Sequence, residues 1–563
     1  MKKLISLVTV LLAVAVIFCG CGTTGYSNGL SDLTGDVKSN GGFVVEKGDY
    51  VYFVNGVGAA TDDNTYGKVT TGALVRVKKS DLVAASSATD LGDDKYYQSK
   101  TQIVIPSLFV AGDKTSGFWI FGNEVFYATP TTAQNKKGEV ENTKLDFVKT
   151  SLTGDNSVKL KTVADNTTVY RFIEVGGKVY LVTKTVNSDS ETVINVYNAT
   201  DNKDVYTTAK IADCIFSEDT AAAEFWYTRA AYNKNEEKDE DFNELHKVVI
   251  TADGVKDYIV LSGAGTFGMS GTSEGFGLLG AKFTLVKDTA STLYIKAEYL
   301  DKSVVTSSPY LAIEKATEFT VVETSAAKDD ADELKKVYVN NAKLVRVSEN
   351  KSADDASSIF ASSSIYVAKN AIVYIDSTYG IIKYDYTGAD EAAYKDSGDY
   401  SLNRTVLYYD ENVTGYTARF VDGGYLYMTD SSSYYYRINL AAFVSMSGEN
   451  KGATLLVNSA NDAAGDNKVT VEKVNFLANK TDWYLPEVID GKYILSLYTA
   501  DPYYSLVYVA DIEANAALDD DAVETIRKSE KSSVKANVAK CVSYITSSMN
   551  DTIKTYFKDT FKD

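Results

Sequence analysis

A short phrase, two turn residues followed by apolar and aromatic residues, recurs along most of the chain. Its clearest copy is GGYLYM at residues 423–428. Further copies begin at Gly48, Gly122, Gly176, Gly280 and Asp490, and two that lack the glycine begin at Ala222 and Lys369. Turn residues before a strand-like run predict a β-hairpin. Eight copies at spacings of roughly 45 to 90 residues predict an all-β fold, a β-propeller whose blades are these repeats.

The number of blades is predicted as seven or eight. In the first repeat, residues 43–46, 50–54 and 74–78 form three strand-like runs, and the last alternates apolar and basic residues, as a strand with one wet face does. Residues 276–350 fit the repeat worst, which leaves the count open by one blade.

The connections between the second and third strands differ in length. They are long at residues 56–72, 130–143 and 231–244, and only a few residues long in the last three repeats. Equivalent loops of a propeller lie on one face, so we expect a loop-rich face along the first half of the ring. Binding residues concentrate on such loops, and we expect the partner site there.

The N-terminus predicts export and lipid attachment. Met1-Lys2-Lys3 and the apolar run 4–18 form a secretory signal. The following Gly20-Cys21 resembles a bacterial lipobox, which implies cleavage before Cys21 and acylation of its thiol. The predicted segments are a signal peptide (1–20), a flexible tether (21–42), the propeller (43–515) and a C-terminal helical segment (516–563). Acyl chains on Cys21 would hold the protein on the outer face of the bacterial cell membrane.

Composition supports strands and excludes one class of partner. The 41 Tyr and 22 Phe favour pleated, half-buried surfaces. The formal net charge is −19, and it becomes −21 once residues 1–20, with two lysines and no acid, are removed. Such a surface repels phosphate groups, so nucleic acid is not an expected partner. It also repels anionic lipid head groups, so we expect the acyl chains rather than the protein surface to contact the membrane.

Two cysteines remain for the folded part of the chain. Cys214 and Cys541 could form a disulfide in an exported protein or stay as separately buried thiols. Sequence alone does not fix which of these holds.

The last segment of the chain predicts a helix. Its apolar residues recur at steps of three and four, the period of an amphipathic helix: Val538, Cys541, Ile545, Met549, Ile553 and Tyr556. Asp519–Asp521 suit its N-terminus. The helix either docks on the propeller or binds a partner.

Two motifs that are associated with catalysis or nucleotide binding lack the neighbouring elements and residues that their function requires. Residues 263–268 match G-x-G-x-x-G after a strand, but a poor helix former follows, so nucleotide binding is not expected. Residues 271–275 match G-x-S-x-G, yet the single histidine, His246, lies upstream rather than downstream. We therefore expect His246 to be a strand residue, and we assign no catalytic residue.

Acidic loops do not fit a metal template. Acids crowd residues 236–244, and residues 62–67 begin like a calcium loop but place Ala73 where the bidentate acid should stand. One histidine leaves no usual zinc site. No metal and no cofactor is predicted.

The repeat phrase and the run Tyr384-Asp385-Tyr386-Thr387-Gly388 look like the propeller domains of unknown function in bacterial lipoproteins, which are distantly similar to YWTD propellers. The nearest match to that tetrapeptide is Phe225-Trp226-Tyr227-Thr228. The resemblance implies a binding or scaffolding role, for a protein or a glycan, without catalysis. The alternatives are a glycan-cleaving enzyme with a carboxylate pair in the central channel, which needs two acids roughly 5 to 10 Å apart, and a structural spacer.

Overall fold

The structure is a computed structural model of the 563-residue chain. It describes residues 28–42, 44–54, 73–81, 102–105, 109, 117–130, 133–134, 140–141, 144–164, 169–232, 238–263, 281–301, 304–307, 310–315 and, beyond these, short segments between residues 321 and 511. The predicted signal peptide, Cys21, Cys541 and the C-terminal helix lie outside the described residues.

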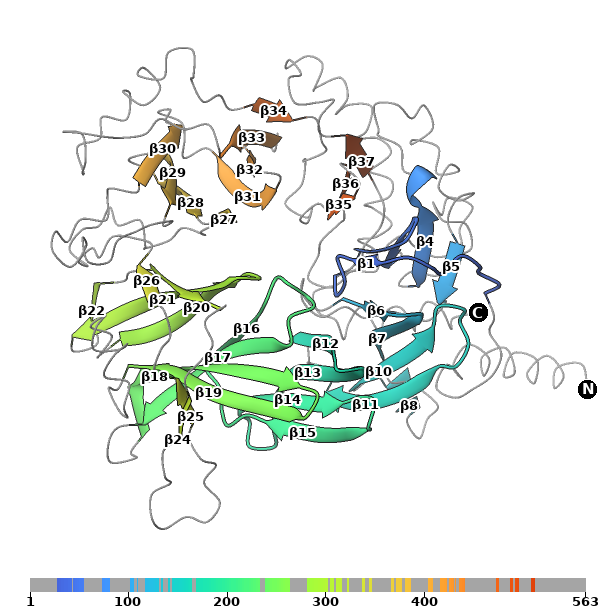
Figure 1. The fold of residues 1–563 in the computed structure, drawn as a ribbon, viewed down its shortest axis with the longest axis horizontal. Coiled ribbons are helices and arrows are strands. Elements are labelled where there is room, and N and C mark those ends of the chain that lie inside the picture. Colours follow the sequence, from blue (N-terminus) through green and yellow to red (C-terminus); the bar gives the residue numbers. More distant parts are fainter. Residues whose placement is uncertain are drawn as a thin grey trace, which may run out of the picture. The chain divides into compact units, whose positions relative to one another are not determined.

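The described residues are almost entirely β-structure (Figure 1). They form nine sheets, and the one helix among them is a single 3-10 turn, η2 (Lys79–Asp81). The sheets fall into two compact units: sheets A, B, D and J belong to one unit, and sheets E, F, G and H belong to the other.

The first unit has the following strands. Sheet A contains β1 (Val37–Lys38), β2 (Val44–Lys47), β3 (Tyr50–Val54), β4 (Leu74–Lys78) and β5 (Gln102–Ile105). Sheet B contains β6 (Trp119–Phe121), β7 (Glu124–Pro130), β10 (Lys144–Ser151) and β11 (Val158–Ala164), with the small hairpin of β8 (Ala133–Gln134) and β9 (Val140–Glu141) between β7 and β10. Sheet D contains β12 (Val169–Val175), β13 (Lys178–Val186), β14 (Thr192–Asn198) and β15 (Lys203–Thr207), and sheet J contains β35 (Glu487–Ile489), β36 (Lys492–Leu495) and β37 (Tyr508–Asp511).

The second unit has longer and less regular sheets. Sheet E contains β16 (Asp213–Phe216), β17 (Glu224–Tyr232), β18 (Lys238–Thr251), β19 (Gly254–Ser262), β25 (Val337–Val339) and β24 (Val321–Glu323). Sheet F contains β20 (Ala281–Asp288), β21 (Thr292–Asp301), β22 (Val304–Ser307), β23 (Tyr310–Glu314) and β26 (Leu344–Arg346). Sheet G contains β27 (Tyr366–Ala368), β28 (Ala371–Asp376), β29 (Gly380–Asp385) and β30 (Arg404–Tyr408), and sheet H contains β31 (Thr417–Asp422), β32 (Tyr425–Thr429), β33 (Tyr435–Asn439) and β34 (Glu472–Val474).

Six sheets contain four strands paired in chain order, the meander that forms a blade of a β-propeller: A, B, D, E, G and H. The described part of the chain therefore confirms an all-β, propeller-type fold. The predicted count of seven or eight blades is corrected to six in the part of the chain that the structure describes. Sheet J has three described strands, and sheet F gains β26 only after β24 and β25 have joined sheet E. That irregularity lies within residues 276–350, which fit the repeat worst.

The repeat phrase marks hairpin turns, as predicted. Val175 pairs with Lys178, so Gly176 and Gly177 alone form the β12–β13 turn, with φ of 59° and 73°. A two-residue turn with positive φ at both central residues matches the twist of the strands that it connects. Glycine adopts positive φ without the steric cost that a Cβ atom would bring. Gly48, with φ of 55°, and Gly122, with φ of 59°, lie in the corresponding turns of sheets A and B.

Aromatic and aliphatic side chains fill the space between successive sheets within each unit. Sheets A and B share a core that includes Tyr52, Leu74, Ile120 and Tyr127. Sheets B and D share one built on Trp119, Phe126, Phe147, Tyr170 and Phe172, and sheets E and F share one built on Trp226, Leu245, Phe283 and Leu293. Most of these rings are at most 2% exposed. The many aromatic residues of the sequence therefore serve to fill the space between neighbouring blades.

Residues 28–42, which we name the N-terminal strap, are bound to sheets A and B. The Asn40 side chain donates to Ile120 O (3.0 Å) and accepts from Ile120 N (2.7 Å), so it pairs with β6 as a strand backbone would. Strand β1 of the strap pairs with β2. The expected flexible tether over residues 21–42 therefore does not hold for residues 28–42. For residues 21–27 it stays a prediction.

Sheets E and F are joined by exchanged strands. The β24–β25 hairpin follows β23 of sheet F in the chain but joins sheet E, where Ile259 of β19 and Tyr338 of β25 pair in parallel. The Asn243 amide adds a second link, because it donates to Phe283 O (2.7 Å) and accepts from Phe283 N (2.6 Å).

Candidate functional site

A groove of about 490 Å³ lies between sheets B and D of the first unit, and we name it the B–D groove. It is formed at the ends of strands β6, β7, β10 and β11 of sheet B and β12, β13 and β14 of sheet D. Pockets that bind small ligands are concave sites of about 300 to 1,000 Å³ with an apolar lining and few polar groups. The groove has the size of such a site.

The floor of the groove is apolar. It is made by Phe121, Phe126, Leu160, Val179 and Ala199. Phe121 is half-buried, and its ring meets that of Phe126 edge to face at 5.4 Å between centroids. Phe126 in turn contacts Phe172 in the core at 5.3 Å. The floor is therefore continuous with the packed core between sheets B and D.

Three turns with left-handed backbone conformations border the groove. Gly122, Gly177 and Asn202, with φ of 59°, 73° and 55°, lie in the β6–β7, β12–β13 and β14–β15 turns. Thr200, which also borders the groove, accepts a hydrogen bond from Val179 N through its hydroxyl (3.0 Å). These tight turns carry short side chains, which keeps the groove open to solvent.

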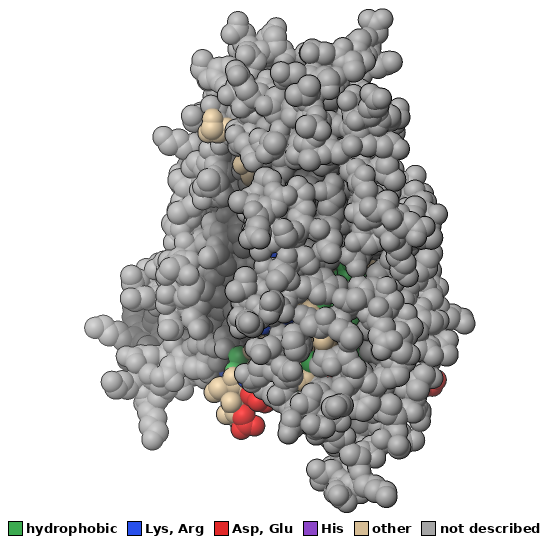
Figure 2. All heavy atoms as spheres, turned by 90° about the vertical axis from the view of Figure 1, so that its left-hand side faces the viewer, with side chains coloured by type: hydrophobic (Ala, Val, Ile, Leu, Met, Phe, Trp, Pro, Cys, Tyr) green, Lys and Arg blue, Asp and Glu red, His purple; other side chains and the backbone are tan. Residues whose placement is uncertain are grey.

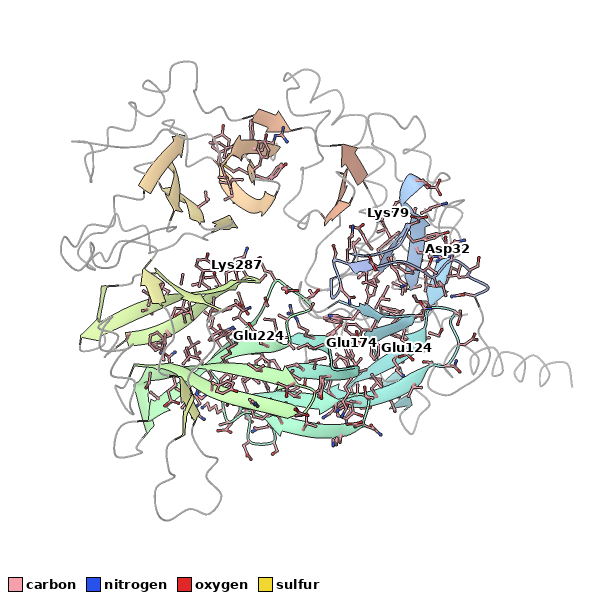
Figure 3. All side chains as sticks on the ribbon, viewed as in Figure 1. Asp32, Lys79, Glu124, Glu174, Glu224 and Lys287 are labelled. Carbon is pink, nitrogen blue, oxygen red and sulfur yellow. The ribbon has the colours of Figure 1, made fainter. Side chains whose placement is uncertain are left out.

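The rim carries charges of both signs. Glu124, Lys149, Lys159 and Glu174 all line the groove. The Lys149 ammonium donates to both oxygens of Glu124, at 2.9 and 3.2 Å, whereas Glu174 is exposed on β12 (Figure 3). Lys159 lies 3.8 Å from the buried Asp146. Two acids and two lysines give the rim no net charge.

This balance differs from the rest of the protein, whose formal net charge is −19. On the face drawn in Figure 2, the largest group of described acidic side chains lies at the lower edge. The groove is thus a locally neutral and polar site on an acidic protein.

The groove does not lie at the loops where we expected the partner site. The long connection between the second and third strands of sheet B follows Pro130, while the groove lies at the Glu124 end of β7, where Lys149 pairs with Phe126. In sheet E the expected loop 231–244 is mostly strand, because β17 extends to Tyr232 and β18 begins at Lys238. Residues 231–232 and 238–244 are therefore strand rather than loop, and residues 233–237 lie outside the described residues.

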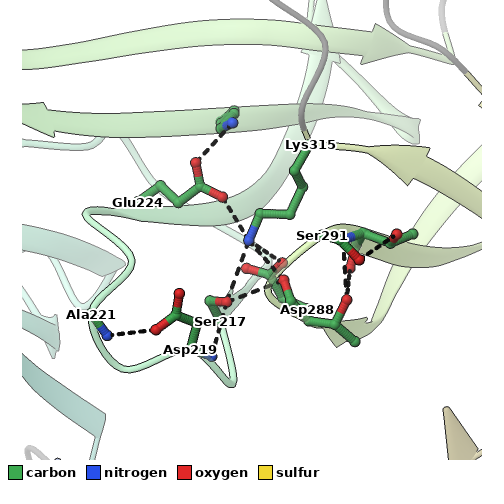
Figure 4. Close-up of polar contacts among 10 residues, drawn as sticks. Ser217, Asp219, Ala221, Glu224, Asp288, Ser291 and Lys315 are labelled. Atoms are coloured by element: carbon green, nitrogen blue, oxygen red, sulfur yellow. Dashed lines mark hydrogen bonds and ion pairs between the residues drawn. The ribbon is translucent and has the colours of Figure 1, made fainter. Parts of the chain in front are cut away.

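A buried ionic cluster joins sheets E and F (Figure 4). The Lys315 ammonium contacts Glu224 (2.6 Å) and Asp288 (2.9 Å) and donates to Thr289 O (2.9 Å). Glu224 also pairs with Lys247 at 2.8 Å. Burial raises the pKa of the Glu224 carboxyl, but the two ammonium groups outweigh burial and lower it overall. Glu224 and Lys247 belong to sheet E, and Asp288 and Lys315 to the chain of sheet F, so these ion pairs hold the two sheets together.

His246 lies in β18, as predicted, and is 2% exposed. Its Nδ1 is 3.0 Å from Asp257 Oδ1, and its Nε2 is 3.3 Å from Glu244 Oε2. Arg229 Nε donates to the same Glu244 oxygen at 3.1 Å. The Tyr227 ring stacks on the imidazole at 4.5 Å. Glu244, expected in a solvated acidic loop, is therefore a buried partner in an ionic network.

The carboxylates decide the protonation of this network. Burial lowers the pKa of His246, but the charge of Asp257 and the hydrogen bonds to Asp257 and Glu244 outweigh burial and raise it. Burial raises the pKa of Glu244, and His246 and Arg229 outweigh it and lower that pKa. Both ring nitrogens face carboxylates, so the imidazolium form is favoured and His246 is not set up as a base.

Several residues singled out in the sequence lie outside the described part. These are Cys21, the calcium-like segment 62–67, most of the G-x-G-x-x-G motif, the G-x-S-x-G motif and Cys541. Cys214 is half-buried on β16, and its disulfide with Cys541 stays a prediction. Within the described part, no three His, Cys, Asp or Glu residues form a group that could hold a metal ion. A search of the same residues finds no helix of the length and hydrophobicity needed to cross a membrane.

Comparison of the sequence with known families and proteins finds no match. No family model matches it, and no curated protein matches it. Among solved structures it is similar to the β-propeller domain of the trilobed protease from Pyrococcus furiosus, with 8% identity, TM-score 0.30, and 70% of this chain and 92% of that chain covered. It is also similar to apo AztD from Citrobacter koseri, with 10% identity, TM-score 0.28, and 67% and 91% covered.

A third similar structure is prolyl oligopeptidase B from Galerina marginata, with 10% identity, TM-score 0.32, and 90% of this chain and 67% of that chain covered. Identities and TM-scores this low carry no argument about this chain. The evidence for the fold is the strand pairing within the sheets, and the evidence for the function proposed below is the chemistry of the groove.

Proposed function

We propose that this protein is a non-enzymatic binding module of the bacterial cell surface, anchored by acyl chains on Cys21, and that it binds a glycan in the B–D groove. The observation that carries the proposal is the combination of an aromatic floor and a charge-balanced rim in one concave site of about 490 Å³. The anchor is supported by the signal and lipobox residues before Cys21.

The rim favours a neutral, hydroxyl-rich ligand. Glu124 and Glu174 can accept hydrogen bonds from hydroxyl groups, and Lys149 and Lys159 can donate to them. A strongly charged ligand would meet as many repulsive as attractive groups, because the four charges cancel. The exposed part of the Phe121 ring offers an apolar surface for the C–H face of a sugar.

The test is titration of the purified protein, without its signal peptide, against a panel of neutral and charged bacterial glycans. Glu174→Gln removes a carboxylate of the rim, and the matched control Asp189→Asn changes an exposed carboxylate in the β13–β14 turn, at the opposite end of sheet D. A hydrogen bond to a charged group contributes about 1.5 to 3 kcal/mol, so Glu174→Gln should weaken binding by roughly tenfold or more. Binding of no glycan, or equal loss in both variants, would refute the proposal.

One observation keeps the glycan-cleaving alternative open for test. Glu124 and Glu174 are two carboxylates that line one concave site, and a glycosidase needs such a pair at a separation of about 5 to 10 Å. Against it, Lys149 bonds both oxygens of Glu124, so this carboxylate is already held by a neighbouring side chain and not directed at a ligand alone. Release of reducing ends from a bound glycan, abolished in Glu124→Gln, would establish the enzyme instead.

A further inference from the structure

The N-terminal strap enters the folded body through Asn28. The backbone N–H of Asn28 donates to Thr153 O (3.0 Å), and its side-chain amide donates to Val104 O (2.9 Å) and Leu152 O (2.8 Å). One residue is thereby fixed both to β5 of sheet A and to the turn that follows β10 of sheet B.

The rest of the strap is held along its length. Arg76, 1% exposed, donates to Ser31 O (2.9 Å) and Asp32 O (3.1 Å). Gly41 N donates to Phe118 O (3.0 Å). Leu30, Leu33 and Val37 pack against the core between sheets A and B. Since these contacts are spread over residues 28–42, the strap leaves no slack between Asn28 and the sheets.

Asn28 lies at the same end of sheet B as the B–D groove, on the side of sheet B that faces sheet A. It bonds Leu152, and Leu152 N donates to Asn123 O (2.8 Å). Asn123 stands between Gly122 and Glu124, which both line the groove. The chain therefore enters the body at the groove end of sheet B, and Lys144, the first residue of β10, lies at the other end.

The covalent link from Cys21 to Asn28 is short. Seven peptide units span at most about 25 Å when fully extended. The eight residues of β10 cover roughly 23 Å from one end of sheet B to the other. The two ends of the sheet thus differ in their distance from Asn28 by nearly as much as the link can span. The remote end could approach Cys21 only if the link were almost fully stretched along the sheet.

We infer that the groove end of sheet B faces the phospholipid bilayer that holds Cys21, so that the B–D groove is membrane-proximal. The inference rests on the proposed lipid attachment and not on the proposed ligand. The protein surface does not attract an anionic bilayer, because the formal net charge is −19. The short link and the strap, rather than lipid-binding side chains, set the orientation. A glycan bound in the groove would then be one that lies next to the membrane.

The test measures distance to the membrane in the full-length lipidated protein, incorporated into phosphatidylcholine vesicles that contain an acceptor-labelled lipid. Cys214→Ser and Cys541→Ser remove the other thiols. Two exposed valines offer matched positions for a donor dye: Val158 (45% exposed) at the groove, and Val186 (47% exposed) at the end of β13 that is remote from the groove. Lys144→Cys gives a second remote position, on sheet B.

Energy transfer to the bilayer should be clearly stronger from Val158→Cys than from Val186→Cys or Lys144→Cys. Insertion of about thirty Gly and Ser residues before Asn28 should largely remove the difference, since a flexible chain of that length has a root-mean-square extent above 30 Å. Equal transfer from all three positions, or stronger transfer from the remote ones, would overturn the inference.

The outcomes separate this inference from the function on which it rests. A full-length protein that does not associate with vesicles refutes the lipid anchor and the orientation together. A protein that shows the expected transfer pattern but binds no glycan confirms the orientation and refutes only the ligand.

Discussion

Alanine substitution at Gly48 tests the contact between the N-terminal strap and sheet A. A Cβ built on Gly48 would lie 2.3 Å from the backbone oxygen of Thr34 in the strap. Gly48 also has φ of 55° and donates from its N–H to Asp36 O (3.1 Å). A methyl group therefore forces the strap to move and weakens the hydrogen bond that aligns it.

Gly122 is the matched control. It lies in the equivalent turn of sheet B with φ of 59°, and a Cβ there meets nothing within 4 Å. Both substitutions place alanine in the left-handed region, which costs about 1 to 2 kcal/mol. Gly48→Ala adds overpacking, about 1 to 3 kcal/mol, and the loss of one hydrogen bond, about 1 kcal/mol. We expect Gly48→Ala to cost roughly 2 to 4 kcal/mol more than Gly122→Ala.

Urea unfolding followed by tryptophan fluorescence measures this difference, because Trp119 and Trp226 are fully buried. Limited proteolysis supplies a local readout: residues 28–42 should be cleaved faster in Gly48→Ala and at the wild-type rate in Gly122→Ala. Equal losses of stability in the two variants, with unchanged cleavage of the strap, would show that the close contact between Gly48 and Thr34 has no energetic role.

Two further predictions concern the buried charges of the second unit. The raised pKa of His246 should stabilise the protein fully below about pH 6.5, the ordinary value for histidine, and this contribution should be lost as the pH rises through the higher folded-state pKa. The free energy of unfolding across this range should depend less on pH in His246→Gln, and an unchanged slope would contradict the network. Lys315→Met leaves the buried Asp288 without its cation and Glu224 with Lys247 alone, and it should cost about 3 to 5 kcal/mol in urea unfolding. Lys287→Met, which removes an ion pair to an exposed carboxylate, should cost less than about 1 kcal/mol, and equal costs would argue against the cluster.

The turns and strands were predictable because their signals are local. The glycines at 48, 122, 176 and 177 have the positive φ that a two-residue hairpin requires, and the alternating runs after them form β3, β7 and β13. The hairpins of sheets B and D follow the phrase closely. No local sequence signal predicts the strand exchange between sheets E and F. The parallel contact of Ile259 with Tyr338 joins residues about eighty positions apart.

The groove was only partly accessible to sequence analysis. Glu124, which lines it, and Lys178, next to it, lie in the repeat phrase just after the turn glycines, so their place at the ends of strands could have been predicted. Lys149, Lys159 and Asn202 come from other strands and turns, and only the register between strands brings them to the same site. The tether prediction failed for residues 28–42 because polar composition does not show that side chains such as Asn28 and Asn40 bond backbone groups of distant strands.

The exchanged strands of sheets E and F limit how this chain could gain or lose repeats. Sheets G and H follow one another without exchanging strands, so deletion of one of these sheets would leave all strands of the other in place. A break between β23 and β26 would instead take the edge strand β26 from sheet F and the β24–β25 hairpin from sheet E. Sheets E and F are therefore interlocked, and neither could be removed without taking a strand from the other.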